Sequence, residues 1–355
     1  MEQQATLAAL KGVSLQAGKT SCLENIHLII HSGEWVGVTG PSGSGKTSLL
    51  RLLAGKAAPS QGSVIFSDAE KRLSEGALQC HPMVGEFRLR YQMLWRLNRQ
   101  GIRGKEAEER CRWAFSLMEL DPEDAAAFPD ALSYGKQRRA EVAMALACRP
   151  RLLLLDDPFC TLEDALRRRL LGNIRAWQKQ AGAAVVYVTQ RKEELSSLSD
   201  QLVLLRAGRI IQQGAPDVLL QSPASHFAAA YWGRGNLLEG VITGSGQGKA
   251  ALEVDGFTLP CHTAGVVTVG EKRGLYIHHR GLLYQPHPGK DTWLSGVLTE
   301  FRQTEEGLMA MIELTGGRTL TALFRPEHDC PVGSRVFLWW KKERALLLPW
   351  DDTVK

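Results

Sequence analysis

Hydrophobic runs of strand length alternate with helix-like segments along the first two thirds of the chain. The clearest strand candidates are apolar or β-branched runs that end in polar or turn residues, and they cover Glu34 to Thr39, Leu152 to Leu155 and Ala184 to Thr189. A helix-like segment, Thr47 to Leu53, follows the first of them. Strands that alternate with helices favour an α/β domain around a largely parallel sheet.

The pattern changes after about Tyr231, where glycine, proline and charged pairs separate short alternating segments and no long amphipathic helix is seen. This change predicts a separate β-rich domain. Within it, the segment 238–243 (LEGVIT) resembles 294–299 (LSGVLT), and the residues that follow each of them are also similar. Two similar β modules that each bury one face are typical of a small barrel or of paired barrels.

Composition narrows the class of protein without assigning a function. A chain of 355 residues is long enough for two domains, and 44% hydrophobic with 23% charged residues excludes collagen-like, disordered and coiled-coil chains. The net charge of +5 is mild. Arginines gather between residues 88 and 112, and we interpret them as a solvated helix face rather than as a nucleic-acid site.

The sequence predicts a chain that stays in the cytoplasm. No apolar segment approaches the ~20 residues that span a bilayer, and the first residues do not have the pattern of a secretory signal. The cysteines are scattered without a Cys-x-x-Cys pair, so we expect reduced packing residues rather than a zinc or redox site.

A glycine-rich segment between the first strand and its helix carries the most specific chemistry. It fits the pattern G-x-x-x-x-G-K-[ST] and consists of Gly40, Pro41, Ser42, Gly43, Ser44, Gly45, Lys46 and Thr47, with Ser48 directly after it. Glycines let backbone N–H groups surround phosphates, the lysine neutralises the β and γ phosphates, and the threonine hydroxyl is a ligand for Mg²⁺. The sequence therefore predicts a nucleotide phosphate site.

The apolar strand at 152–155 ends in Asp156 and Asp157. An open α/β sheet binds its ligands at the carboxyl ends of its strands. We therefore expect Asp156 to hold the Mg²⁺ of a bound nucleotide, through water.

Three further segments carry a family resemblance. The run Leu132 to Arg139 (LSYGKQRR) resembles the signature motif of ATP-binding cassette (ABC) proteins, Asp156 to Phe159 resembles the segment that follows it, and Asp200 to Gly214 resembles the family's strand-and-turn ending. The resemblance covers about residues 5 to 230. The tail from about Asn236 resembles the paired small domains, called TOBE-like, of importer-type cassettes.

The resemblance implies a P-loop NTPase cassette over 1–232, with a helical subdomain over about 80–130. It also implies a smaller all-β, OB-like domain over 233–355 with modules at about 236–285 and 292–350. Cassettes of this family bind ATP between two chains, so a second ATP-binding subunit is implied, as a homodimer or a heterodimer. Ser133 and Gly135 would cap the nucleotide of the opposite chain, although a serine there is also an ordinary helix N-cap.

The resemblance also gives expected roles in hydrolysis. Asp157 stands where an acid polarises the attacking water, and Gln190 stands at a position that contacts the γ-phosphate. Gln79 stands at a position that touches the metal and the water, with Gln92 as a rival for that role. Trp95 and Trp113 of the helical subdomain belong either to a docking surface for a permease helix or to its core.

Several positions depart from the family pattern. Asp157 replaces a glutamate, which moves the carboxylate back by about 1.5 Å, and Gln190 replaces a histidine, so no positive charge is available there. The other departures are Ala17 for an aromatic residue, Lys136 for a glutamine and Glu163 for an aspartate. Two interpretations stay open: a functional ATPase, or a cassette that binds MgATP but hydrolyses it weakly beside a more active partner.

The leading prediction is the cytoplasmic ATPase subunit of an importer, at the inner membrane, with permease subunits and an extracytoplasmic solute-binding protein as partners. The solutes of importers with this tail include polyamines, ferric iron, phosphonates, sulfate, thiamine and sugars, and the sequence does not choose among them. A ribosome- or DNA-associated cassette is an alternative class, against which the single cassette argues. In a third class the β tail binds a small ligand or anion that regulates the cassette, with contacts from His262, His278, His279 and Arg280, although we favour the interpretation of these residues as a generic exposed strand edge.

Overall fold

The computed structural model describes residues 5–17, 20–67, 77–79, 83, 85–246, 248–263, 265–289, 293–304, 306–326 and 330–350. The chain divides into two compact units, Met1–Pro216 and Asp217–Lys355. The sequence predicted the boundary near residue 232. The division lies earlier because α9 (Pro216–Gln221) and α10 (His226–Trp232) pack within the second unit, where the Tyr276 hydroxyl donates to the Leu220 carbonyl at 3.2 Å.

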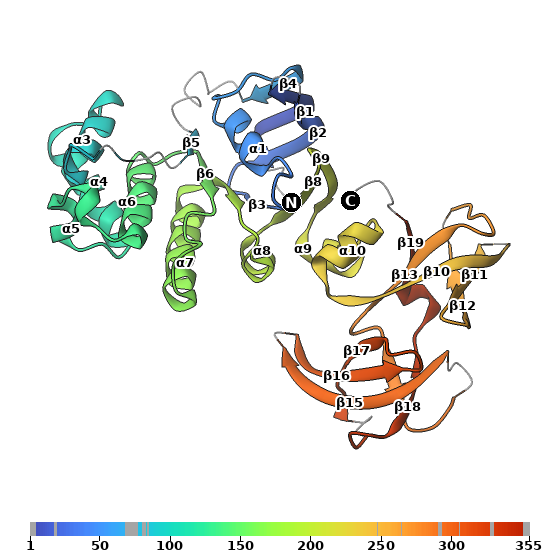
Figure 1. The fold of residues 1–355 in the computed structure, drawn as a ribbon. Helices are drawn as coiled ribbons and strands as arrows, with labels where there is room; N and C mark the ends of the chain where they lie inside the picture. Colours follow the sequence, from blue (N-terminus) through green and yellow to red (C-terminus); the bar gives the residue numbers. More distant parts are fainter. Residues whose placement is uncertain are drawn as a thin grey trace. The chain divides into compact units, whose positions relative to one another are not determined.

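The N-terminal unit is built on two sheets (Figure 1). A three-stranded antiparallel sheet has the order β2-β1-β4, and a six-stranded, mainly parallel sheet has the order β5-β6-β7-β3-β8-β9. The strands are β1 (Thr6–Ala17), β2 (Thr20–His31), β3 (Trp35–Thr39), β4 (Gln61–Phe66), β5 (Ala77–Gln79), β6 (Leu152–Asp156), β7 (Ala184–Val188), β8 (Gln201–Arg206) and β9 (Arg209–Gly214).

The central strands of the larger sheet confirm the predicted α/β class. All of β3 and β7 is buried, as is β6 apart from Asp156, and these are the apolar runs that the sequence identified. Both faces of a parallel sheet are covered, so its strands read as continuous hydrophobic runs. The core between the two sheets also receives the four buried leucines of α1 (Lys46–Leu53).

A group of helices lies between β5 and β6 in the chain (Figure 1). It consists of α3 (Leu89–Arg99), α4 (Gly104–Leu117), α5 (Pro122–Ala126), the 3₁₀ turn η2 (Pro129–Ala131) and α6 (Tyr134–Ala147). After β6 come α7 (Asp164–Ala181) and, beyond β7, α8 (Lys192–Leu198).

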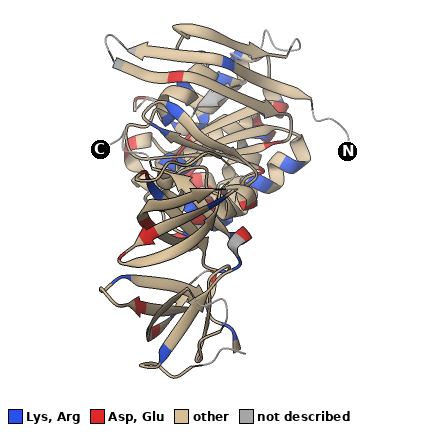
Figure 2. Cartoon of the chain, turned by 90° about the vertical axis from the view of Figure 1, so that its right-hand side faces the viewer, with Lys and Arg blue, Asp and Glu red and all other residues tan. Residues whose placement is uncertain are grey.

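Two of the arginines of α3 and α4 form local ion pairs. Arg90 contacts Glu108 at 2.6 Å and Arg110 contacts Glu106 at 2.7 Å. Basic and acidic residues are interspersed along the ribbon in Figure 2. The Arg90 side chain is 55% exposed but that of Arg110 is only 16% exposed, so a solvated helix face describes only some of these arginines.

The C-terminal unit holds a closed barrel, β10-β11-β12-β19-β13, and a five-stranded sheet, β14-β18-β15-β16-β17, whose inner residues share one hydrophobic core. The strands are β10 (Gly235–Gly246), β11 (Lys249–Val254), β12 (Phe257–His262), β13 (Lys272–His278), β14 (Leu283–Gln285), β15 (Leu294–Thr304), β16 (Gly307–Leu314), β17 (Thr319–Leu323), β18 (Arg335–Trp339) and β19 (Ala345–Pro349), with the turn η4 (Lys342–Arg344) before the last.

The two similar segments of this unit make matching contacts. The Ile242 N–H donates to the Glu271 carbonyl at 2.9 Å, and the Leu298 N–H donates to the Ser334 carbonyl at 3.0 Å. The two modules that begin with these segments also exchange their last strands. β14, the last strand of the first module, pairs with β18 of the sheet, whereas β19, the last strand of the second module, pairs with β12 and β13 of the barrel. This exchange closes the barrel and removes its open edge.

Candidate functional site

The glycine-rich loop joins β3 to α1, and its backbone requires glycine at two positions. Gly40 has φ 149°, and a Cβ there would lie 2.0 Å from the Leu205 carbonyl oxygen. Gly45 has φ 102°, and a Cβ there would lie 2.7 Å from the Cys22 carbonyl oxygen. Gly45 is also the N-cap of α1 and offers no capping side chain. The first N–H groups of α1 therefore face the loop without a side-chain cap, which favours an anion.

Lys46 folds back over this loop. Its Nζ donates to the carbonyls of Gly40 at 2.8 Å and Pro41 at 2.7 Å, and to Ser44 Oγ at 3.2 Å. Burial lowers the pKa of Lys46, and the negative charges of the two aspartates at the end of β6 oppose that shift. The ammonium thus lies where a phosphate would replace backbone carbonyls as its partner.

Thr47 brings α1 to the end of β6. Its Oγ1 donates to Asp156 Oδ2 at 2.9 Å, although the two residues are far apart in the sequence. A cavity of about 240 Å³ lies beside this pair. It is lined by Ser21, Cys22, Gly43, Ser44, Gly45, Lys46, Thr47 and Ser48. Pro41 and Ser42 of the same loop are exposed and do not line it.

The hydroxyl and the carboxylate fit a magnesium ion. Mg²⁺ takes oxygen ligands and is usually held by one or two protein groups together with substrate phosphates and water. Asp156 is exposed at the end of its strand, and its Oδ2 is bonded to Thr47, which lines the cavity. Among the described residues no group of three histidine, cysteine or acidic side chains forms a metal site made by protein alone.

Asp157 is held at the same edge by the end of β7. Its backbone has a positive φ of 42°, and its N–H donates to the Val188 carbonyl at 2.9 Å. The buried Thr189 donates from Oγ1 to Asp157 Oδ1 at 3.4 Å. Burial raises the pKa of Asp157, with the bond from Thr189 opposing the rise and the charge of Glu194 adding to it. Gln190 follows Thr189 and is exposed.

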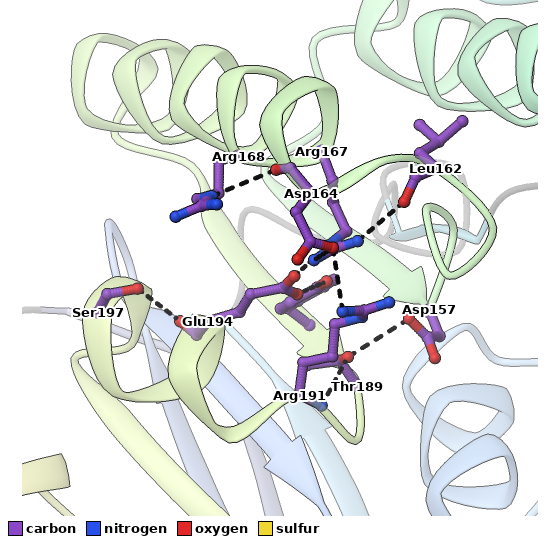
Figure 3. Close-up of polar contacts among 10 residues, drawn as sticks. Asp157, Leu162, Asp164, Arg167, Arg168, Thr189, Arg191, Glu194 and Ser197 are labelled. Atoms are coloured by element: carbon purple, nitrogen blue, oxygen red, sulfur yellow. Dashed lines mark hydrogen bonds and ion pairs between the residues drawn. The ribbon is translucent and has the colours of Figure 1, made fainter. Parts of the chain in front are cut away.

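A network of polar side chains that the sequence did not reveal lies to one side of this aspartate (Figure 3). The buried Arg167 of α7 is bonded to Glu194 of α8, and it also donates to Asp164 Oδ1 at 2.7 Å and to the Leu162 carbonyl at 2.9 Å. Tyr187 of β7 donates its hydroxyl to Glu194 at 2.6 Å. The one available signal was the i, i+3 spacing of an acid and a base at the start of α7.

Ser133 and Gly135 begin α6. Ser133 is the N-cap, and its Oγ accepts from the Lys136 N–H at 3.4 Å. A Cβ at Gly135 would lie 2.7 Å from Leu162 Cδ2, so the glycine allows close packing against the loop after β6. The Lys136 ammonium is bonded to Asp124 at 2.8 Å. Neither Ser133 nor Gly135 lines the cavity of the same chain.

Gln79 ends β5, beside β6 in the sheet, but its side chain lies outside what the structure describes, as does that of Ala17. The rival Gln92 lies on α3, where its amide donates to the Phe87 carbonyl at 2.6 Å. In the part of the chain that the structure describes, no helix is both long enough and apolar enough to cross a bilayer.

These features define a nucleotide-binding protein with a phosphate loop. The family model described as ABC transporter matches residues 23–160. The chain is 34% identical to the spermidine/putrescine import ATP-binding protein PotA of Oleidesulfovibrio alaskensis over 77% of this chain and 75% of that one. It is 30% identical to the PotA of Methylococcus capsulatus over 98% and 94%, and 33% identical to the Fe(3+) ions import ATP-binding protein FbpC of Brucella abortus over 70% and 72%.

Solved structures show the same fold. A dimeric ATP-binding cassette in a post-hydrolysis state, bound to ADP and Pi, matches with a TM-score of 0.54 and 24% identity over 59% of this chain and 99% of that one. An ATP-binding subunit of an ABC transporter matches with a TM-score of 0.55 and 22% identity over 60% and 92%. The chain belongs to the ABC transporter family, as an importer-type ATP-binding subunit with ATPase activity.

Proposed function

We propose that the chain hydrolyses MgATP on the cytoplasmic face of the inner membrane and drives import of a solute through permease subunits. One observation carries the proposal most directly. The Lys46 ammonium, the Thr47 hydroxyl and the Asp156 carboxylate converge beside a cavity at the carboxyl edge of the sheet. That set neutralises phosphates and holds a divalent cation, which is what a transport ATPase requires.

The residues of the site take distinct roles in this proposal. The N–H groups of 40–48 and Lys46 bind the phosphates, and Thr47 with Asp156 holds Mg²⁺, with Gln79 as a further ligand. When bound, the ion would neutralise charge on the phosphates of the nucleotide. Asp157 accepts a proton from the attacking water, and Gln190 donates a hydrogen bond to the γ-phosphate.

A second ATP-binding subunit completes the proposed site. Ser133 and Gly135 do not reach the cavity of their own chain, and the N-terminus of α6 that carries them suits a phosphate. We therefore place them against the nucleotide of the opposite subunit. The dimeric cassette bound to ADP and Pi has the same fold and supports this arrangement.

An apolar surface on α3 supports a permease partner. Phe87, Tyr91 and Trp95 are 55%, 64% and 61% exposed, and they line a groove of about 740 Å³. Large exposed aromatic side chains in one groove are typical of an interaction site. We therefore propose that Trp95 belongs to the docking surface, whereas Trp113 is partly buried under the guanidinium of Arg149.

The substrates in the names of the relatives, spermidine or putrescine and Fe(3+), are chemically different. We propose that the solute is selected by an extracytoplasmic solute-binding protein and by the permease, and that this chain supplies the energy. The relatives favour this active subunit over a weakly hydrolysing cassette.

The experiment compares MgATP binding and phosphate release by the purified full chain with those of Lys46→Ala. The matched control is Lys56→Ala, an exposed lysine just beyond α1. We expect Lys46→Ala to weaken binding and to remove turnover, because the phosphate charge loses its partner, whereas Lys56→Ala keeps both. Turnover that survives Lys46→Ala would contradict the proposed function.

A further inference from the structure

Arg191 joins two segments that meet beside Asp157. Its backbone N–H donates to Thr189 Oγ1 at 3.2 Å, and its guanidinium Nη1 donates to Asp164 Oδ1 at 3.4 Å (Figure 3). Thr189 and Arg191 follow β7, whereas Asp164 begins α7 at the end of the loop after β6. Arg191 thus links Asp164, at the start of α7, to the Thr189 hydroxyl, which contacts Asp157.

The partner of Arg191 is itself fixed. Asp164 Oδ1 also accepts from Arg167 Nη2 at 2.7 Å, and the Arg167 side chain is only 4% exposed. Arg167 is held in turn by Glu194 and by the Leu162 carbonyl. Because the carboxylate is already held in place, an ion pair between it and an exposed arginine costs less side-chain entropy than a pair with a mobile acid.

The hydrogen-bonding capacity of the Thr189 hydroxyl connects Arg191 to Asp157. A threonine hydroxyl has one hydrogen to donate and accepts through its lone pairs. The Arg191 N–H occupies an acceptor site of Thr189, and the Thr189 hydroxyl donates its hydrogen to Asp157 Oδ1. Gln190 lies between the two bonded residues, so its backbone is held on both sides.

We propose that Arg191 is a positioning residue of the hydrolytic site: its contact with Asp164 fixes the segment 189–191, which orients the Thr189 hydroxyl on Asp157 and presents Gln190 to the nucleotide. The inference rests on the proposed function, since it assigns a role within hydrolysis. A misplacement of 1 Å at a reacting centre can cost about 10²-fold in rate. Loss of one of several anchors is therefore expected to lower kcat about tenfold and to leave the KM for ATP unchanged.

The test measures steady-state ATP hydrolysis by the full chain for Arg191→Ala, Asp164→Asn, the double variant and Arg191→Lys. We expect each of the first two to lower kcat about tenfold, and the double variant to be no slower than the slower of them, because Arg191→Ala removes the donor and Asp164→Asn removes the charge of the same contact. Arg191→Lys, which keeps a cation within reach of Asp164, should recover part of the loss. A merely structural role would move the unfolding temperature instead, so that temperature is measured for every variant.

Arg169→Ala is the matched control. Arg169 lies on α7 and forms a similarly exposed pair with Glu119 at 3.0 Å, but it has no bond to the segment 189–191. It should keep kcat within about twofold. Wild-type kcat in Arg191→Ala, or independent losses that multiply in the double variant, would overturn the inference. Turnover that does not depend on Lys46 would overturn the proposed function, and this inference with it.

Discussion

Replacing Asp157 by asparagine separates the chemistry of this residue from its place in the fold. The backbone at position 157 has a φ of 42°, a region in which asparagine and aspartate are tolerated better than most residues. The amide oxygen of asparagine can still accept from the Thr189 hydroxyl, which lies 3.4 Å from Asp157 Oδ1. We therefore expect the free energy of unfolding to change by less than about 1 kcal/mol.

The effect on hydrolysis should be far larger. A side chain that accepts a proton in the transition state typically contributes about 10² to 10⁴ in rate, which corresponds to roughly 3 to 5 kcal/mol of barrier. Asparagine removes this acceptor together with a negative charge near the phosphates. We expect kcat to fall at least about 10²-fold, while the affinity for MgATP is kept or increased.

The assay follows phosphate release at saturating MgATP, with nucleotide binding measured on the same preparation. Asp157→Glu serves as the companion variant, because it keeps the carboxylate and extends it by about 1.5 Å. It should retain measurable turnover. An asparagine variant whose kcat stays within about twofold of the wild type would refute the assignment of Asp157 as the proton acceptor.

Two predictions concern the C-terminal unit. The buried Asn236 donates to the Thr321 carbonyl at 2.8 Å and accepts from the Thr321 N–H at 2.7 Å. Asn236→Ala should therefore lower the free energy of unfolding, measured by denaturant titration, by about 2 to 4 kcal/mol. An unchanged unfolding midpoint would contradict this prediction. Burial acts to raise the pKa of Glu306, but bonding to His279 and the charge of Arg234 outweigh it, so the pKa lies below its ordinary 4.5. The contribution of this carboxylate to the free energy of unfolding is then complete above pH 4.5 and is lost as the pH falls through the lowered pKa. The difference in stability between wild type and Glu306→Gln should therefore shrink on acidification. A difference that stays constant with pH would exclude the effect.

The phosphate loop could be predicted from the sequence because its structure is local. Gly40 and Gly45 adopt backbone conformations that side chains rarely allow, and Lys46 and Thr47 follow them directly. The buried strands before and after it were equally readable, since a parallel strand covered on both faces is a continuous apolar run. Asp156 could be placed at the same edge from this topology alone.

Contacts between distant segments could not be predicted. Thr189 reaches Asp157 across 32 positions, and Arg191 reaches Asp164 across 27. No period or motif relates these residues, and their meeting depends on how β6 and β7 pair. The exchange of β14 and β19 between the two sheets of the C-terminal unit was hidden for a similar reason: the repeated segments have the same strand pattern, so either sheet could accept either strand.

The presence of the buried ion pair of Arg167 and Glu194 is better explained by the segments that it holds together than by a gain in the free energy of unfolding. Their side chains are 4% and 7% exposed, and the cost of removing two charges from water can equal or exceed their mutual attraction. Two apolar residues could therefore fill this space at similar stability. They could not supply the bonds that Arg167 makes to the Leu162 carbonyl and to Asp164, or the acceptor that Glu194 offers to Tyr187. These bonds join α7, α8 and β7 to the loop after β6 through the Leu162 carbonyl, and we propose that they hold this loop in place for hydrolysis.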